Sequence, residues 1–184
     1  MEIMSLKIPD VKIFTPQKIS DERGFFSETY NREKFLSNQI DINFVQDNHS
    51  LSLENGVIRG LHFQIPPYDQ DKLVRVVSGS ILDVAVDLRE SSPTFGHHVK
   101  AVISVEEWNQ ILVPVGFAHG FCTLESNTEV IYKVSNYFSP EHDKGLRWND
   151  PSLGIEWPVS EDLAILSEKD LSQPFFSGLP IYFK

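Results

Sequence analysis

Residues 81–88 read ILDVAVDL, and this stretch decides the class of fold. Leucine and valine fill every even position, while the odd positions carry isoleucine, alanine and the two aspartates Asp83 and Asp87. A two-residue period is that of a β-strand whose two faces differ. We therefore expect residues 81–88 to form a half-buried strand.

Strand patterns continue on both sides of this segment. Residues 72–77 precede the turn Ser78-Gly79-Ser80 and are expected to form a hairpin with residues 81–88. Helical signals are few: Asn31 can cap a short run that extends to Gln39, and a turn or two is expected near Leu163. Many short strands without long helices predict an all-β sandwich or barrel. The further strands are expected at residues 99–105, 110–113 and 130–137.

Composition bounds the class of protein. The 184 residues, 41% of them apolar, contain no linker or repeat and fit one domain over residues 1–184. The formal charge of −10 disfavours a nucleic-acid partner, although a few clustered basic residues can still hold one nucleotide. A single cysteine, Cys122, and the absence of a signal-like start or a long apolar run predict a cytoplasmic protein with no membrane partner.

Two histidine motifs are the main chemical signals, because the sequence carries no Walker A, GxGxxG or GxSxG pattern. In RGLHFQ at residues 59–64, His62 is the candidate base. PVGFAHG at residues 114–120 has the PxGxxH spacing of cupin barrels, in which the histidine points into the barrel, so we expect His119 to face the same cavity. A metal-binding cupin normally carries a second histidine where Gln64 stands. We therefore expect no metal and no cofactor, and a metal-dependent oxygenase is disfavoured.

An ordered series of motifs extends along nearly the whole chain: DERGFFSETY (21–30), FVQDNHS (44–50), RGLHFQ (59–64), KLVRV (72–76), VAVDLR (84–89), SPTFG (92–96), VPVGFAHGF (113–121), WNDP (148–151), and residues 132–140 and 167–170. Through these motifs the sequence resembles the dTDP-4-dehydrorhamnose 3,5-epimerase family. The resemblance implies a cupin-type jelly-roll barrel (a double-stranded β-helix) with a few short helices, acting without a metal as a homodimer. It also implies inversion of dTDP-4-dehydro-6-deoxy-D-glucose at carbons 3 and 5, giving dTDP-4-dehydro-L-rhamnose on the route to dTDP-L-rhamnose.

The resemblance also implies a role for individual residues. His62 matches the base, Asp170 the carboxylate that orients it, Tyr132 the acid on the opposite face, and Lys72 the group that stabilises the enolate. Phe138 would stack on thymine, where some relatives have tyrosine, and Asp143 stands where some have glutamate. The full set that the resemblance assigns to substrate binding is Arg23, Glu28, Gln46, Asp47, Asn48, Arg59, His119, Phe138, Asp143 and Lys169.

Other interpretations stay open from the sequence. A related mono-epimerase or a 3,4-ketoisomerase would share the barrel, although Tyr132 beside His62 favours epimerisation over a keto shift. A non-catalytic sugar-binding cupin would need the pocket but not the base, acid and orienting carboxylate together. Ser167-x-x-Asp170 is also a helix-capping pattern, which gives Asp170 a purely structural alternative.

Overall fold

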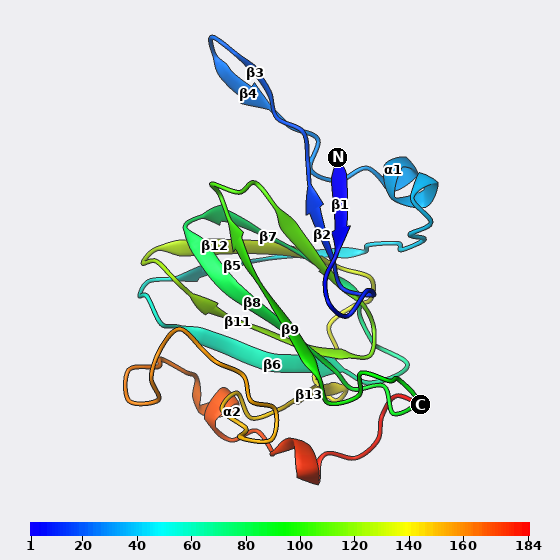
Figure 1. Ribbon diagram of the computed structural model, residues 1–184, viewed down its shortest axis with the longest axis vertical. Coiled ribbons are helices and arrows are strands. Elements are labelled where there is room, and N and C mark those ends of the chain that lie inside the picture. The colour runs from blue at the N-terminus through cyan, green and yellow to red at the C-terminus, as the bar shows by residue number, and fades with distance from the viewer.

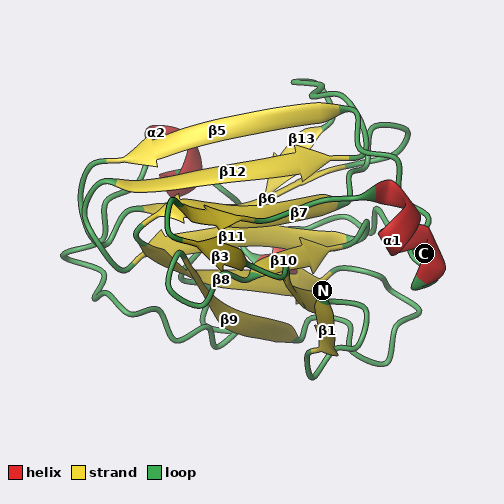
Figure 2. Ribbon diagram, turned by 90° about the horizontal axis from the view of Figure 1, so that it is seen from above, coloured by secondary structure: helices red, strands yellow, loops and turns green.

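Two antiparallel β-sheets face each other in the computed structural model, which describes residues 1–184 (Figures 1 and 2). The predicted all-β class with few short helices is confirmed. The six-stranded sheet has the order β1 (Glu2–Ser5), β2 (Lys12–Thr15), β10 (Gln110–Val113), β7 (Lys72–Ser78), β12 (Thr128–Val134) and β5 (Gln46–Ser52). The five-stranded sheet has the order β13 (Asp143–Gly145), β6 (Ile58–Gln64), β11 (Phe117–Thr123), β8 (Ser80–Asp87) and β9 (His98–Ser104).

The predicted hairpin between residues 72–77 and 81–88 is wrong. Both strands exist, but β7 pairs with β10 and β12, whereas β8 pairs with β11 and β9 in the facing sheet. Gly79 makes the connection at a φ of +77°, and a Cβ there would lie 2.4 Å from Oγ1 of Thr128. A glycine packed so closely against β12 turns the chain sharply toward the other sheet.

The prediction of a half-buried strand at residues 81–88 is also wrong, because β8 is covered on both faces. Ile81 and Ala85 pack into the core between the sheets. Val84 and Val86 point the other way and pack with Leu146, Leu153 and Phe183 of the C-terminal part of the chain. The face that carries the two aspartates is therefore the inner one, toward the facing sheet.

The short helix α1 (Arg32–Ser37) packs against the part of the outer face of the six-stranded sheet that β2, β10 and β7 form. Its predicted cap is confirmed, since the Asn31 side chain accepts a hydrogen bond from Lys34 N. Phe35 stacks on Phe14 of β2, with ring centroids 4.8 Å apart. The helix ends at Ser37, two residues before the predicted Gln39.

The C-terminal part of the chain runs along the five-stranded sheet and contains little regular structure (Figure 1). Only a turn is found near Leu163, and the helical residues follow in α2 (Glu168–Leu171) and in a 3-10 turn at Phe176–Gly178. No helix of the chain is long and apolar enough to cross a membrane.

A small hairpin of β3 (Ile19–Asp21) and β4 (Gly24–Phe26) projects away from the two sheets (Figure 1). Its base contacts the barrel through Phe25, which meets the edge of Trp108 with ring centroids 4.8 Å apart. Within the single chain, Phe26 is 69% exposed and Ile19 is 59% exposed. The hairpin therefore presents an apolar surface that its own chain leaves largely uncovered.

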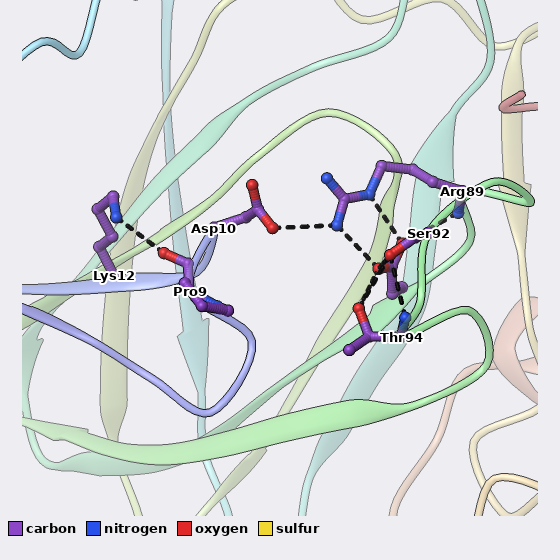
Figure 3. Close-up of polar contacts among 7 residues, drawn as sticks. Pro9, Asp10, Lys12, Arg89, Ser92 and Thr94 are labelled. Atoms are coloured by element: carbon purple, nitrogen blue, oxygen red, sulfur yellow. Dashed lines mark hydrogen bonds and ion pairs between the residues drawn. The ribbon is translucent and has the colours of Figure 1, made fainter.

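One end of β8 is held by a polar cluster around the fully buried Asp87. Figure 3 shows the side chains of Asp10, Arg89, Ser92 and Thr94 that belong to this cluster. Arg89 donates to this carboxylate through Nε at 2.9 Å and Nη2 at 2.8 Å, and it also reaches Asp10 at 3.2 Å. The hydroxyls of Ser92 and Thr94 donate to Asp87 as well. Burial alone would raise the pKa of Asp87, but these hydrogen bonds outweigh it and lower the pKa to about 2. The cluster therefore ties the N-terminal loop to the loop that follows β8.

Candidate active site

A cavity of about 480 Å³ is lined by residues from both sheets and from α2. His62 and His119 come from the five-stranded sheet, Lys72 and Tyr132 from the six-stranded sheet, and Asp170 from α2. A second cavity of about 380 Å³ shares three of its lining residues, His62, Lys72 and Tyr132, with the first. The four residues predicted to be catalytic thus meet in one place, as does His119.

A β-bulge in β6 sets the direction of the His62 side chain. His62 lies opposite His119 on β11, and Arg59 lies opposite Phe121. The two β6 residues are three positions apart and their partners on β11 are only two positions apart, so β6 contains one extra residue. In a regular strand, residues three apart point to opposite faces, but here Arg59 and His62 line the same cavity. Gly60 takes up the bulge at a φ of +119°, and a Cβ there would lie 2.6 Å from Cα of Gly120. Only glycine fits such an approach of two backbones.

His62 is held by a buried carboxylate. Its Nε2 donates a hydrogen bond to Oδ1 of Asp170, which is 3% exposed. The second oxygen, Oδ2, accepts from Ser167 Oγ at 2.9 Å, and this hydroxyl also accepts from Asp170 N as the cap of α2. Burial acts to raise the pKa of Asp170, but the hydrogen bonds from His62 and Ser167 prevail and lower it. The capping pattern and the contact with His62 are therefore both real, and the cap fixes the carboxylate that holds the imidazole.

Lys72 and Tyr132 face His62 from the opposite sheet. Lys72 Nζ donates to the carbonyl oxygen of His62 at 3.3 Å. Burial lowers the pKa of Lys72 to about 8, although the charges of Asp143 and Asp83 act in the opposite direction. Burial raises the pKa of the Tyr132 phenol, so this group keeps its proton at neutral pH. The cavity thus combines a proton acceptor, a proton donor and an ammonium group.

The second cavity brings together several of the residues expected to bind substrate. Phe138 is 56% exposed, and its backbone N–H is held by the side chain of Gln46 at 3.2 Å. Lys169 and Asp143 form an ion pair at the edge of this space. From the predicted substrate-binding set, Gln46, Asn48, Phe138, Asp143 and Lys169 line the second cavity, and Arg59 and His119 line the first.

Gln64 also lines the second cavity, and its role was not predicted from the sequence. Its amide nitrogen donates to the carbonyls of Tyr68 and Tyr137, and its oxygen accepts from Ser139 N. These bonds hold the segment that carries Phe138. Gln64, which stands in place of a second cupin histidine, therefore shapes the cavity. The signal in the sequence is its position two residues after His62, because residues two apart on a strand share a face.

Three of the residues expected to bind substrate are not brought to either cavity by their own chain. Arg23 lies on the projecting hairpin, has a side chain 85% exposed, and pairs with Asp21. Glu28 pairs with Lys34 at the start of α1. Asp47 pairs with a lysine, Lys133 at 2.9 Å, across the β5–β12 ladder. The single chain therefore places seven of the ten predicted substrate-binding residues at the two cavities and leaves these three outside them.

Proton transfer is the chemistry that the first cavity is equipped for, and together with the two-sheet barrel it defines an acid–base enzyme of cupin type. The family model described as dTDP-4-dehydrorhamnose 3,5-epimerase matches residues 5–178. The enzyme of that description from Sinorhizobium fredii is 50% identical over 184 residues, which cover 100% of this chain and 94% of the relative. The chain belongs to the dTDP-4-dehydrorhamnose 3,5-epimerase family, and its activity is that of an isomerase in dTDP-L-rhamnose biosynthesis.

Solved structures agree with this assignment and confirm the cupin-type fold. The epimerase from Bacillus anthracis, with TDP and pyrophosphate bound, has 47% identity and a TM-score of 0.91 over 95% of this chain and 98% of that one. The enzyme from Legionella pneumophila, in complex with dTDP-4-keto-L-rhamnose, has 40% identity and a TM-score of 0.92 over 97% and 94%. A 3'-monoepimerase from Streptomyces bikiniensis in complex with dTDP-quinovose shares the fold at 30% identity, with a TM-score of 0.87 over 94% and 87%.

Proposed function

We propose that the hexose ring of a dTDP-4-keto-6-deoxy sugar binds where the two cavities meet. The observation that carries this proposal is that His62, Lys72 and Tyr132 line both cavities. The nucleotide then extends past Arg59, Phe138 and Lys169, since arginine forks suit a diphosphate and an aromatic ring suits a base. Relatives that were crystallised with TDP or with a dTDP-keto sugar support a ligand of this class.

In this proposal the three shared residues divide the steps of inversion. The ketone at carbon 4 makes the hydrogens on carbons 3 and 5 acidic, so His62 removes a proton from one face of the ring. The electron pair moves to the carbonyl oxygen, where Lys72 stabilises the enolate. Tyr132 then gives a proton to the opposite face and the ketone is restored. Asp170 keeps the imidazole oriented and stabilises its charged form.

A mutant of the monoepimerase described above supports this choice of residue types. The 3'-monoepimerase from Streptomyces bikiniensis was crystallised with dTDP as a double mutant in which a histidine and a tyrosine are replaced. Those are the two residue types that we assign to proton removal and proton return.

The test of the function is an NMR experiment in deuterium oxide with dTDP-4-dehydro-6-deoxy-D-glucose. We expect deuterium to enter at both carbons 3 and 5 and the product to be dTDP-4-dehydro-L-rhamnose. Exchange at one carbon alone would indicate a mono-epimerase, and movement of the ketone to carbon 3 would indicate a ketoisomerase. Binding of the sugar nucleotide without any exchange would contradict the proposed chemistry.

We also propose that the chain acts as a homodimer in which the β3–β4 hairpin covers the partner. The apolar side chains of Ile19 and Phe26 are uncovered in the single chain, and large exposed apolar surface marks an interaction site. In a two-fold dimer each hairpin lies on the other subunit, so Arg23 and Glu28 would complete the partner's nucleotide site.

The dimer proposal predicts that Phe26→Ser yields a monomer. The substitution removes apolar contact from the centre of the proposed interface and leaves the barrel unchanged, so the mass in solution should halve at micromolar concentration. Leu163→Ser is the matched control, because Leu163 is 67% exposed and lies far along the chain from the hairpin. Light scattering after size exclusion measures both variants. A wild-type protein that is already monomeric at that concentration would contradict the proposal.

A further inference from the structure

Asp83 is a buried charged group to which the mechanism above gives no task. It is fully buried on the inner face of β8. One oxygen, Oδ2, accepts a hydrogen bond from Nε2 of His119 at 2.7 Å. The other oxygen, Oδ1, has no hydrogen-bond partner, a condition that it shares with only one other buried side-chain atom, Oγ of Ser50. An unpaired buried carboxylate oxygen destabilises a fold, so its presence points to a functional demand.

Strand register places Asp83 beside the catalytic residues. On β11, Phe121 lies opposite Asp83, and His119 is two positions away on the same face. His119 in turn lies opposite His62 on β6. A row of polar side chains therefore crosses three neighbouring strands and leads from the base to the deeply buried carboxylate.

The groups around Asp83 and Lys72 define a local charge balance. Burial raises the pKa of Asp83, while the positive charges of His119 and Lys72 and the hydrogen bond from His119 act to lower it. Burial lowers the pKa of Lys72, the negative charges of Asp143 and Asp83 act to raise it, and the positive charge of Lys169 acts to lower it. The other ionisable groups that line the cavities of Lys72 are His62, Tyr132, Arg59 and Asp170. Lys72 Nζ makes one hydrogen bond within the protein, to the His62 carbonyl, although an ammonium group has three donors.

We propose that Asp83 is a positioning residue for the side of the site that binds the enolate oxygen. It accepts the hydrogen bond from Nε2 of His119 and so stabilises the imidazolium form, whose Nδ1–H can donate to the substrate oxygen. It also supplies negative charge that keeps Lys72 protonated at the moment when the enolate forms. Asp83 itself does not touch the substrate. This inference rests on the proposed function, because it concerns the oxygen at carbon 4 of the keto sugar.

The test is Asp83→Asn, which removes the charge and keeps the shape. We expect kcat to fall about 100-fold, the loss typical of one preorganised group at a developing oxyanion. The dTDP affinity should stay within about threefold, because the nucleotide binds elsewhere in the cavities. The alkaline limb of the kcat/KM profile should move to lower pH. In the wild type the pKa of Lys72 is about 8, and loss of a nearby negative charge lowers it further, so the active protonated form is lost earlier.

Asp87→Asn is the matched control, because Asp87 lies on the same strand face and is equally buried but belongs to the Arg89 cluster. It should lower thermal stability and leave both kcat and the alkaline limb unchanged. If Asp83→Asn keeps kcat within threefold and leaves the limb in place, the inference is overturned. An equal loss of kcat in Asp87→Asn would also overturn it, because it would show that any buried charge on this strand has the same effect.

A measurement on the unaltered protein covers the case in which Asp83→Asn does not fold. Nitrogen-15 NMR of the histidine rings, with His119 assigned from a His119→Gln spectrum, should show the proton of His119 on Nε2. A neutral ring protonated at Nδ1 alone would overturn the inference. Failure of the function itself is seen separately, as a wild-type protein that exchanges no deuterium at carbons 3 and 5.

Discussion

His62→Asn lowers kcat by about 10⁴-fold, the upper end of what one general base contributes, while dTDP binding stays within about threefold. The reason is that both inversions start with removal of a proton by the same imidazole. Asparagine keeps a side-chain amide that can still donate to Asp170, so the buried carboxylate is not left unpaired. Loss of deuterium exchange at carbons 3 and 5 measures the chemistry, and titration calorimetry with dTDP measures the binding.

The control for this variant is His49→Asn. His49 lies on β5 with a side chain 55% exposed, and it pairs with Glu129, so its replacement should leave turnover unchanged. If His62→Asn kept a tenth of the wild-type kcat, another residue would have to be the base. If it lost dTDP binding together with turnover, the loss would have to be assigned to the shape of the pocket and not to removal of the base.

Five strands in the middle of the chain, β7 to β10 and β12, could be predicted from the sequence because period-two patterns depend on local alternation. What the pattern could not give is which face of β8 looks inward. Apolar residues at the even positions suggested that the Asp83 face meets solvent, but the C-terminal segment covers the apolar face and leaves the aspartates toward the interior. Segments distant in the chain decide this, and alternation contains no information about them.

His62 and His119 could be named from their motifs and the other site residues from the family resemblance, but their geometry depends on features that a regular strand would not have. The spacing of Arg59 and His62 fits one cavity only because of the bulge at Gly60. The turn at Gly79 is a second case. In the sequence, Ser78-Gly79-Ser80 is typical of a hairpin turn, and the packing of Gly79 against Thr128 is seen only in the structure. Backbone approaches of this kind are set by tertiary packing, which local sequence does not show.

Tyr132→Phe should separate proton exchange from inversion. Without the hydroxyl, His62 can still remove a proton and return a deuteron to the same face, whereas the opposite face has lost its acid. We expect net inversion to fall between about 100-fold and 1000-fold, within the range of one general acid, while deuterium still enters the starting sugar without inversion. The pKa of the phenol is raised by burial, so the wild-type group is protonated throughout the neutral range and its loss should matter at every pH there.

Following both deuterium content and configuration in one NMR time course tests this prediction, and the ratio of exchange to inversion is the decisive quantity. Tyr137→Phe is the matched control, because Tyr137 follows β12 and is 62% exposed, so its hydroxyl should be dispensable. A Tyr132→Phe enzyme that inverts the sugar within threefold of the wild-type rate would show that water or another residue is the acid. Equal loss of exchange and inversion would instead place Tyr132 in substrate positioning, because a pure acid on the far face is not needed for proton removal.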